Sequence, residues 1–372
     1  MEPKNHDIEP YKILFPIGIL CSVIGLSFWI LFQSRLINFY PAESHGNLMY
    51  FGFLWTFIAG FLMTAVPKMM STMAVTLAEI SVAVSFSFLQ IILTIRNETR
   101  LSSYLVLFQL LFLLFFLIRR FIISRKFPFA GFIFIPTALL LALSGAIIFI
   151  TTGNRSLFLL LSGEAFVLNL ILGLGSRLVP VISRLPNALL PHQNSNTKES
   201  FIGSLIFAIL FNATYFMQAL DLINLALIAR TLIITYALVK YFGLFKNPVK
   251  WTVVGVGLKI TSTFLALGTL LSIPYFGYSL AGLHVLYIGG FVLITLLIST
   301  RVVLAHGGES LDYEISSRKV TAIITCLIMA SLLRLLANTH STSNLVFFSF
   351  LFFVAAVALW TTKMLKVETK NR

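Results

Sequence analysis

Long apolar stretches recur along this chain, and short polar loops separate them. A helix needs about 20 apolar residues to cross the hydrocarbon core of a bilayer, because each residue advances it by about 1.5 Å. Backbone polar groups in lipid must be satisfied within the segment, so such stretches predict helices. We therefore expect an all-α bundle of twelve transmembrane helices, at residues 13–33, 48–66, 74–95, 101–118, 129–151, 157–179, 201–220, 222–241, 251–272, 280–300, 320–336 and 345–364.

The composition supports an integral membrane protein. Hydrophobic residues make up 58% of the chain and charged residues 11%, whereas an average soluble domain has about 25% charged residues. The loops are short, so residues 1–372 are expected to form a single polytopic membrane domain. The formal net charge of +14 lies in those loops, where it sets topology, and we exclude nucleic acid as a partner. Membrane lipid is the expected surrounding.

The distribution of Lys and Arg predicts the orientation. Cationic residues concentrate in the loops on the side of the N-terminus, and three more lie within spans. Because cytoplasmic loops carry the excess of positive charge, both termini are expected in the cytoplasm, with the protein in the inner (cytoplasmic) membrane. The opposite side carries only Arg35, Arg96, Arg100 and Arg155.

That topology sorts the six histidines. His45, before the second span, and His284, near the start of the tenth, lie toward the outer face with His340. His192 and His306 lie toward the inner face, and His6 is in the N-terminal tail. His284 and His306 would be about 33 Å apart on a continuous helix, too far to share a metal.

His45 and His284 are candidates for the axial ligands of one haem. Neutral imidazole is a common ligand of haem iron, and one histidine from each of two helices would hold the group between them. The alternative is that both are interfacial anchors. Gly52, Gly289 and Gly290 would leave room either for a flat macrocycle or for close helix packing.

Ionisable residues inside the spans also need an explanation, because each costs about 2.5–3.5 kcal/mol on insertion scales. Arg334, toward the outer end of its span, could pair with haem propionates or with a carboxylate such as Asp221. Glu164 could belong to a proton path or pair with Lys259. The remaining two of these residues are Glu79 and Arg230.

Three sequence segments resemble the NnrS family, haem- and copper-containing membrane proteins associated with nitric oxide metabolism and nitrosative stress. The segments are "GNLMYFGFLWTFIAGFLMTAVP", "LGLGSRLVPVIS", which contains Arg177, and "LHVLYIGGFVLITLLISTRVVLAHGG". The most specific part is His284 with Thr300, Arg301 and His306. The resemblance implies that Arg301 and His306 form a second polar or metal site at the inner end of the tenth helix; the alternative is an ordinary basic helix end with a glycine stop.

The chain departs from the family before the second helix, where the family typically has a His-x-His-Glu-Met pattern. Here His45 and Met49 remain, but Asn47 and Leu48 replace the second histidine and the glutamate. The resemblance therefore implies haem b, and copper at this position is in doubt.

A more distant resemblance is to the catalytic subunit of haem-copper oxidases and nitric oxide reductases. On that mapping His45 and His284 take the places of the low-spin haem ligands, and Glu164 is kept. Gly282 and Ser162 stand where ligands of the binuclear centre would be. One bis-histidine haem survives this comparison and the binuclear centre does not.

The leading hypothesis is a haem protein for electron transfer or redox sensing, since two imidazoles leave no open iron position. Nitric oxide is its candidate ligand, and a quinol or a cytochrome its candidate electron donor. The alternatives are a twelve-helix secondary transporter and a structural subunit without cofactor. A transporter should show two matching halves, whereas "FLMTAVPKM", "GSRLVPVIS" and "STRVVLAHG" recur in the second, sixth and tenth spans and indicate three four-helix units.

Overall fold

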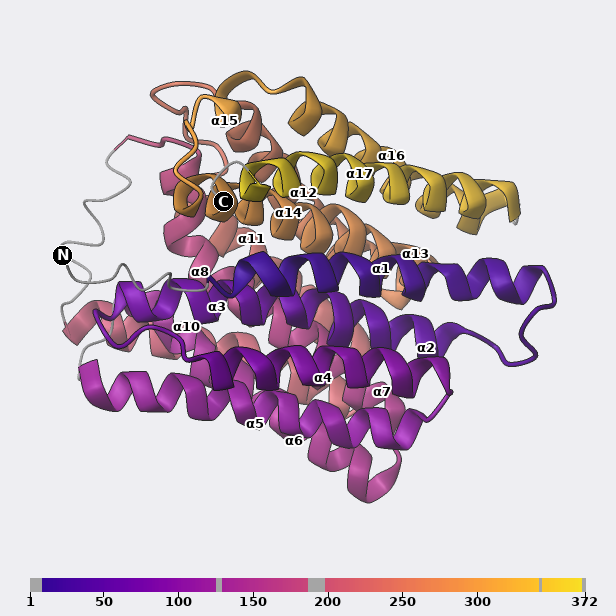
Figure 1. The fold of residues 1–372 in the computed structure, drawn as a ribbon. Coiled ribbons are helices and arrows are strands. Elements are labelled where there is room, and N and C mark those ends of the chain that lie inside the picture. The colour runs from indigo at the N-terminus through magenta and orange to yellow at the C-terminus, as the bar shows by residue number, and fades with distance from the viewer. Residues whose placement is uncertain (1–8, 125–128, 187–197, 341–342, 370–372) are drawn as a thin grey trace. The chain divides into compact units, whose positions relative to one another are not determined.

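The computed structural model describes residues 9–124, 129–186, 198–340 and 343–369. Within these ranges the secondary structure is entirely helical, and twelve helices are long and apolar enough to cross a membrane (Figure 1). The predicted all-α fold with twelve spans is confirmed. His6 and His192 lie outside the described residues, as does the side chain of His340.

Contacts between residues divide the chain into two compact units, each described here by itself. The first comprises residues 1–128 and 139–163, and the second comprises residues 129–138 and 164–372. Helix α6 and the π-helical segment η3 contribute residues to both.

The first unit begins with four spanning helices. α1 packs against the second spanning helix, and α4 packs against α5. Gly18 of α1 allows the first of these contacts, since a Cβ there would meet the side chains of Thr56 and Phe57. The helices are α1 (Tyr11–Gln33), α2 (Ala42–Asn47) continued by η1 (Leu48–Leu54) and α3 (Trp55–Met69), α4 (Leu77–Ile95) and α5 (Thr99–Ser124).

The fifth and sixth spanning helices connect the two units along the chain. The fifth consists of η2 (Ala130–Ile133) and α6 (Phe134–Thr152). The sixth consists of α7 (Arg155–Phe158), η3 (Leu159–Ala165) and α8 (Phe166–Ile182).

The second unit completes the chain. α12 packs closely on the tenth spanning helix, where a Cβ at Gly268 would meet the backbone of Leu286. α16 and α17 form an antiparallel pair. The elements are α10 (Lys198–Ala219), α11 (Ile223–Lys240), α12 (Val253–Leu271), η4 (Pro274–Phe276), α13 (Ser279–His284), η5 (Val285–Val292), α14 (Leu293–His306), α15 (Tyr313–Ser316), α16 (Arg318–His340) and α17 (Ser343–Thr369).

Two helix boundaries differ from the sequence expectation in ways that matter for function. The second spanning helix starts at Ala42, so His45 lies inside a helix and not before it. The fourth spanning helix, α5, runs to Ser124, so Arg119 and Arg120 lie within it and not in a loop. Polar residues 42–47 begin the second spanning helix, and two arginines interrupt the apolar run of α5, so hydropathy alone leaves both extensions out of a span.

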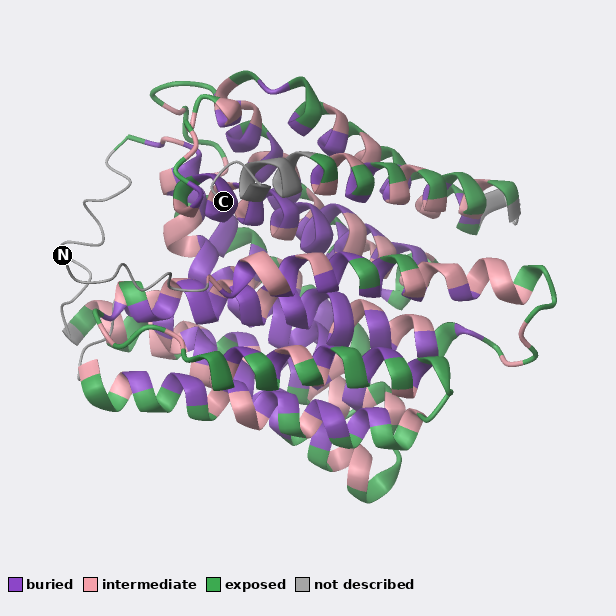
Figure 2. Cartoon of the chain, in the orientation of Figure 1, coloured by how far each residue is buried: buried purple, intermediate pink, exposed green. Residues whose placement is uncertain are grey.

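The second, sixth and tenth spanning helices share one irregularity. Each starts with a short α segment, widens into seven or eight residues of π-helix, and continues as a long α-helix. In each of these three spans, between 67% and 78% of the residues in an apolar stretch of 18 are buried. The corresponding share is at most 50% in the other nine spans among the described residues (Figure 2). The recurrence falls on the three spans in which the sequence segments repeat.

Candidate functional site

The candidate functional residues lie within or just before the π-helical segments. His45 lies three residues before η1, His284 immediately before η5, and Glu164 within η3. A π turn re-aims the side chains beside it, and such turns occur frequently at functional sites. Hydropathy cannot reveal a π turn, because it averages over the segment.

His45 is half-buried in the first unit, on the face of α2 that meets α1. Its Nδ1 lies 3.1 Å from the carbonyl oxygen of Gly25, and its ring meets the edge of Trp29 at a centroid distance of 6.1 Å. A carbonyl oxygen only accepts, so Nδ1 donates the proton and Nε2 carries the lone pair. This is the tautomer in which metal-ligating histidines are usually held.

His284 has the same arrangement in the second unit. Its Nδ1 donates to the carbonyl oxygen of Leu280, one turn earlier, at 2.8 Å. Its ring centroid lies 6.3 Å from that of Tyr287, one turn later. Both candidate ligands therefore have their orientation and tautomer fixed by a backbone carbonyl.

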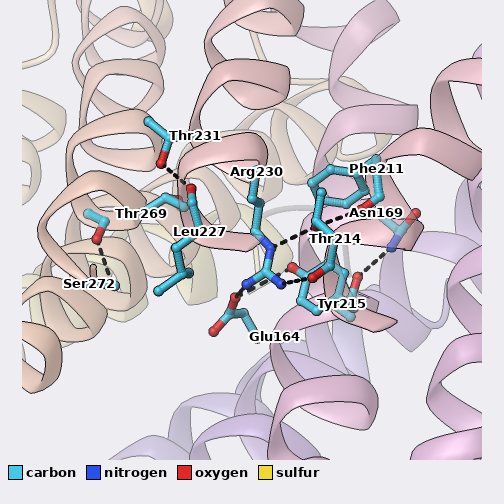
Figure 3. Close-up of polar contacts among 12 residues, drawn as sticks. Glu164, Asn169, Phe211, Thr214, Tyr215, Leu227, Arg230, Thr231, Thr269 and Ser272 are labelled. Atoms are coloured by element: carbon cyan, nitrogen blue, oxygen red, sulfur yellow. Dashed lines mark hydrogen bonds and ion pairs between the residues drawn. The ribbon is translucent and has the colours of Figure 1, made fainter. Parts of the chain in front are cut away.

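Glu164 belongs to a buried ionic cluster (Figure 3). Its Oε1 accepts from Arg230 Nη1 at 3.0 Å and from the Tyr215 hydroxyl at 3.4 Å, and its Oε2 accepts from the Tyr287 hydroxyl at 3.4 Å. Glu164 is 5% exposed and Arg230 is fully buried. The predicted alternative that Glu164 pairs with Lys259 is wrong, because Lys259 instead donates to the carbonyl oxygen of Lys246 and lies over Trp251.

The guanidinium of Arg230 is satisfied on every nitrogen. Its Nε donates to Thr214 Oγ1 at 3.1 Å and its Nη2 to the carbonyl oxygen of Thr214 at 3.3 Å. Its carbon Cζ lies 3.6 Å from the ring centroid of Tyr215. Sequence reasoning missed Thr214 and Tyr215, although the polar "FNATYF" within an apolar span is a visible signal.

A second buried ion pair lies in the first unit. Arg120 is fully buried, and its Nη1 and Nη2 each donate to a carboxylate oxygen of Glu79 at 3.0 Å. Glu79 also closes a capping box with Thr76 at the start of α4. Sequence reasoning placed Arg120 in a cytoplasmic loop, and the adjacent Glu79 within a span was its only signal.

The inner end of α14 holds Arg301 and His306. Arg301 Nη1 lies 2.6 Å from Oε2 of Glu314, which is 1% exposed. Burial raises the pKa of Glu314, and the nearby Arg301 lowers it by less. His306 is the last residue of α14, directly before Gly307. The structure therefore brings a carboxylate to Arg301 that the sequence did not connect with it.

The other predicted residues have different surroundings. Arg177 lies over the ring of Phe129, with 5.2 Å from Cζ to the ring centroid. Met49 faces α1 at Gly25, and Arg334 lies in α16. Gly289 packs against Phe264, where a Cβ would overlap the ring, and Gly52 packs against Cys21. Gly290 likewise faces Leu265, so these glycines support the close-packing alternative.

The described part of the chain holds no group of three or more His, Cys, Asp or Glu side chains arranged for a metal ion. Axial haem ligation needs only two histidines, so this observation does not bear on it.

The fold and its polar interior define a class: an all-helical membrane protein of twelve spans among the described residues, three of them interrupted by π-helical segments. Glu164 lies within one of these segments, and His45 and His284 lie shortly before the other two. The family model described as NnrS protein matches residues 8–372, nearly the whole chain, and the chain therefore belongs to the NnrS family. A comparison with curated proteins finds no match.

Proposed function

We propose that this NnrS-family membrane protein binds haem b through His45 and His284 and acts in electron transfer or redox sensing in nitric oxide metabolism. The observation that supports it best is the matched state of the two histidines. Each histidine lies shortly before a π-helical segment and donates Nδ1–H to a backbone carbonyl, so that Nε2 is the ring nitrogen that carries the lone pair for ligation.

The protein's own residues would hold the group and exclude water from it. A haem with two imidazole ligands supplies one-electron chemistry, and nitric oxide enters this proposal as a ligand that displaces one histidine. The ring of Trp29 lies beside His45 and that of Tyr287 beside His284. The electron donor in this proposal is a quinol or a cytochrome.

An optical spectrum of the purified protein tests the proposal. A haem Soret band is expected in the wild type, and its loss is expected in His45→Ala, in His284→Ala and in the double variant. His306→Ala is the matched control, because it removes a histidine from the same helix as His284 and should leave the band unchanged. A wild type without haem, or a double variant with an unchanged spectrum, rules out the ligand assignment.

Two further measurements separate the parts of the proposal. Metal analysis should find iron without stoichiometric copper. Addition of nitric oxide should change the spectrum, and an unchanged spectrum would leave electron transfer but remove nitric oxide as a ligand.

We also propose that both termini face the cytoplasm, in the inner (cytoplasmic) membrane. The support is the excess of Lys and Arg in loops on the side of the N-terminus. Labelling of a cysteine introduced at position 97, in the loop between α4 and α5, by an impermeant reagent applied to intact cells tests this orientation. Labelling from outside is expected, and protection there would reverse the assignment.

A further inference from the structure

Arg155 bridges the turn of helix that carries His45. This residue starts the sixth spanning helix, and its Nη2 donates to the side-chain oxygen of Asn47 at 2.5 Å and to the backbone carbonyl of Glu43 at 3.4 Å. Glu43 and Asn47 are one helical turn apart, with His45 between them. Arg155 therefore joins both ends of the turn that presents the candidate ligand.

The orientation of Asn47 follows from the same contact. A guanidinium only donates, so Asn47 must turn its oxygen toward Arg155 and its Nδ2 away from it. Asn47 is 1% exposed, and its Nδ2 has no hydrogen-bond acceptor among the described residues. Because the amide has one orientation, the position of Arg155 determines that of Asn47 and, through it, the position of this turn of α2.

The charge of Arg155 is also only weakly compensated. Its Nε and Nη1 are buried and meet no hydrogen-bond acceptor in the described chain. The ring centroids of Phe158 and Phe149 lie 5.3 and 5.8 Å from Cζ of Arg155. The exposed carboxylate of Glu43 attracts the guanidinium at longer range, and no ion pair between them is formed in the described residues. Arg120 and Arg230, the fully buried arginines, each have a carboxylate at 3.0 Å.

A partly buried cation without an ion-paired carboxylate produces a field that salt screens weakly. This field favours any nearby group that gains an electron. The electron would arrive at the iron held by His45, two residues from Asn47 along α2.

We propose that Arg155 is a positioning residue for the haem site: it fixes the turn that carries His45, and its positive charge raises the reduction potential of the haem. This inference rests on the proposed function. Arg155 is not itself a ligand, and its two effects are separable: its hydrogen bonds orient the turn that carries His45, and its charge raises the reduction potential.

Redox titration tests the charge. Arg155→Gln should shift the reduction equilibrium about tenfold toward the oxidised haem, about 59 mV for one electron, and the shift should persist at high salt. Arg155→Lys keeps the charge and should stay within about threefold of the wild type. Arg96→Gln is the control, because Arg96 is exposed in the same unit and its removal should have no effect that survives high salt.

Electron paramagnetic resonance of the oxidised haem tests the hydrogen bonds. Arg155→Lys and Asn47→Ala should change the g-values, which report the orientation of the axial imidazoles, while Arg96→Gln should not. Should Arg155→Gln fail to fold, Asn47→Asp neutralises the guanidinium in place and should lower the potential in the same direction.

The outcomes are distinguishable. Haem that binds in every variant with an unchanged potential and unchanged g-values overturns the role of Arg155 and leaves the proposed function intact. A wild type that binds no haem overturns the proposed function itself.

Discussion

Arg230 Nη1 and Glu164 Oε1 lie 3.0 Å apart in the interior of the second unit, where neither side chain is more than 6% exposed. The pair joins the π segment of the sixth spanning helix to α11, and Tyr215 and Thr214 complete its hydrogen bonds. Every nitrogen of the guanidinium has a partner, so the ion pair stabilises the packing between these helices.

Removal of one partner of this ion pair should destabilise the protein much more than removal of both. Arg230→Met leaves the Glu164 carboxylate buried without its cation, which should destabilise the protein by about 3–5 kcal/mol. The double variant Arg230→Met with Glu164→Leu should recover most of that loss, because no unpaired charge remains. Unfolding in mixed detergent measures both, and a double variant as unstable as the single one would contradict this explanation.

Arg119 and Arg120 should differ sharply in their contribution to stability. Arg120→Gln breaks the bidentate contact between a fully buried guanidinium and the partly buried Glu79, so a loss of about 3 kcal/mol is expected. Arg119 is 53% exposed with its Nη1 3.8 Å from Glu79, so Arg119→Gln should cost less than about 1 kcal/mol. Unfolding of the two variants under identical conditions checks the prediction, which fails if they are equally stable.

Gly289→Ala should destabilise the packing of η5 on α12. The added Cβ would overlap the ring of Phe264, and overpacking of this kind typically costs about 1–3 kcal/mol. A second change, Phe264→Ala, removes the ring and should make the alanine at 289 nearly neutral. Thermal unfolding of the four proteins in this double-mutant cycle measures the coupling. If Gly289 instead only makes room for a cofactor, Gly289→Ala should weaken haem retention with no coupling to Phe264.

The titration of Glu314 should make stability depend on pH in a defined direction. Its pKa in the folded protein is raised above the ordinary 4.5 by burial. The folded state therefore holds this proton more tightly than the unfolded state, and the group's contribution to stability falls as the pH rises from 4.5 through the raised value. Glu314→Gln removes the titration. Relative to that variant the wild type should lose stability over this window, and a difference that is constant with pH would contradict the prediction.

Local sequence was sufficient for the part of the fold that depends on lipid. Spans of about 20 apolar residues identified twelve helices, because hydropathy and the need to satisfy backbone polar groups act on each segment separately. The repeat among the second, sixth and tenth spans was visible for the same reason. The first residues of the helices were harder to predict from sequence than the helices themselves, as the polar turn around His45 shows.

Partner choice depended on the tertiary structure. The sequence suggested Lys259 as the partner of Glu164, and only helix packing selects Arg230 instead. The same holds for Arg155 with Asn47 and for Arg120 with Glu79, since these contacts join residues 108 and 41 positions apart. The sequence determined which segments enter the membrane and which histidines are candidate ligands. The tertiary structure decided which polar groups meet and where the helices widen into π turns, because both depend on non-local packing between helices.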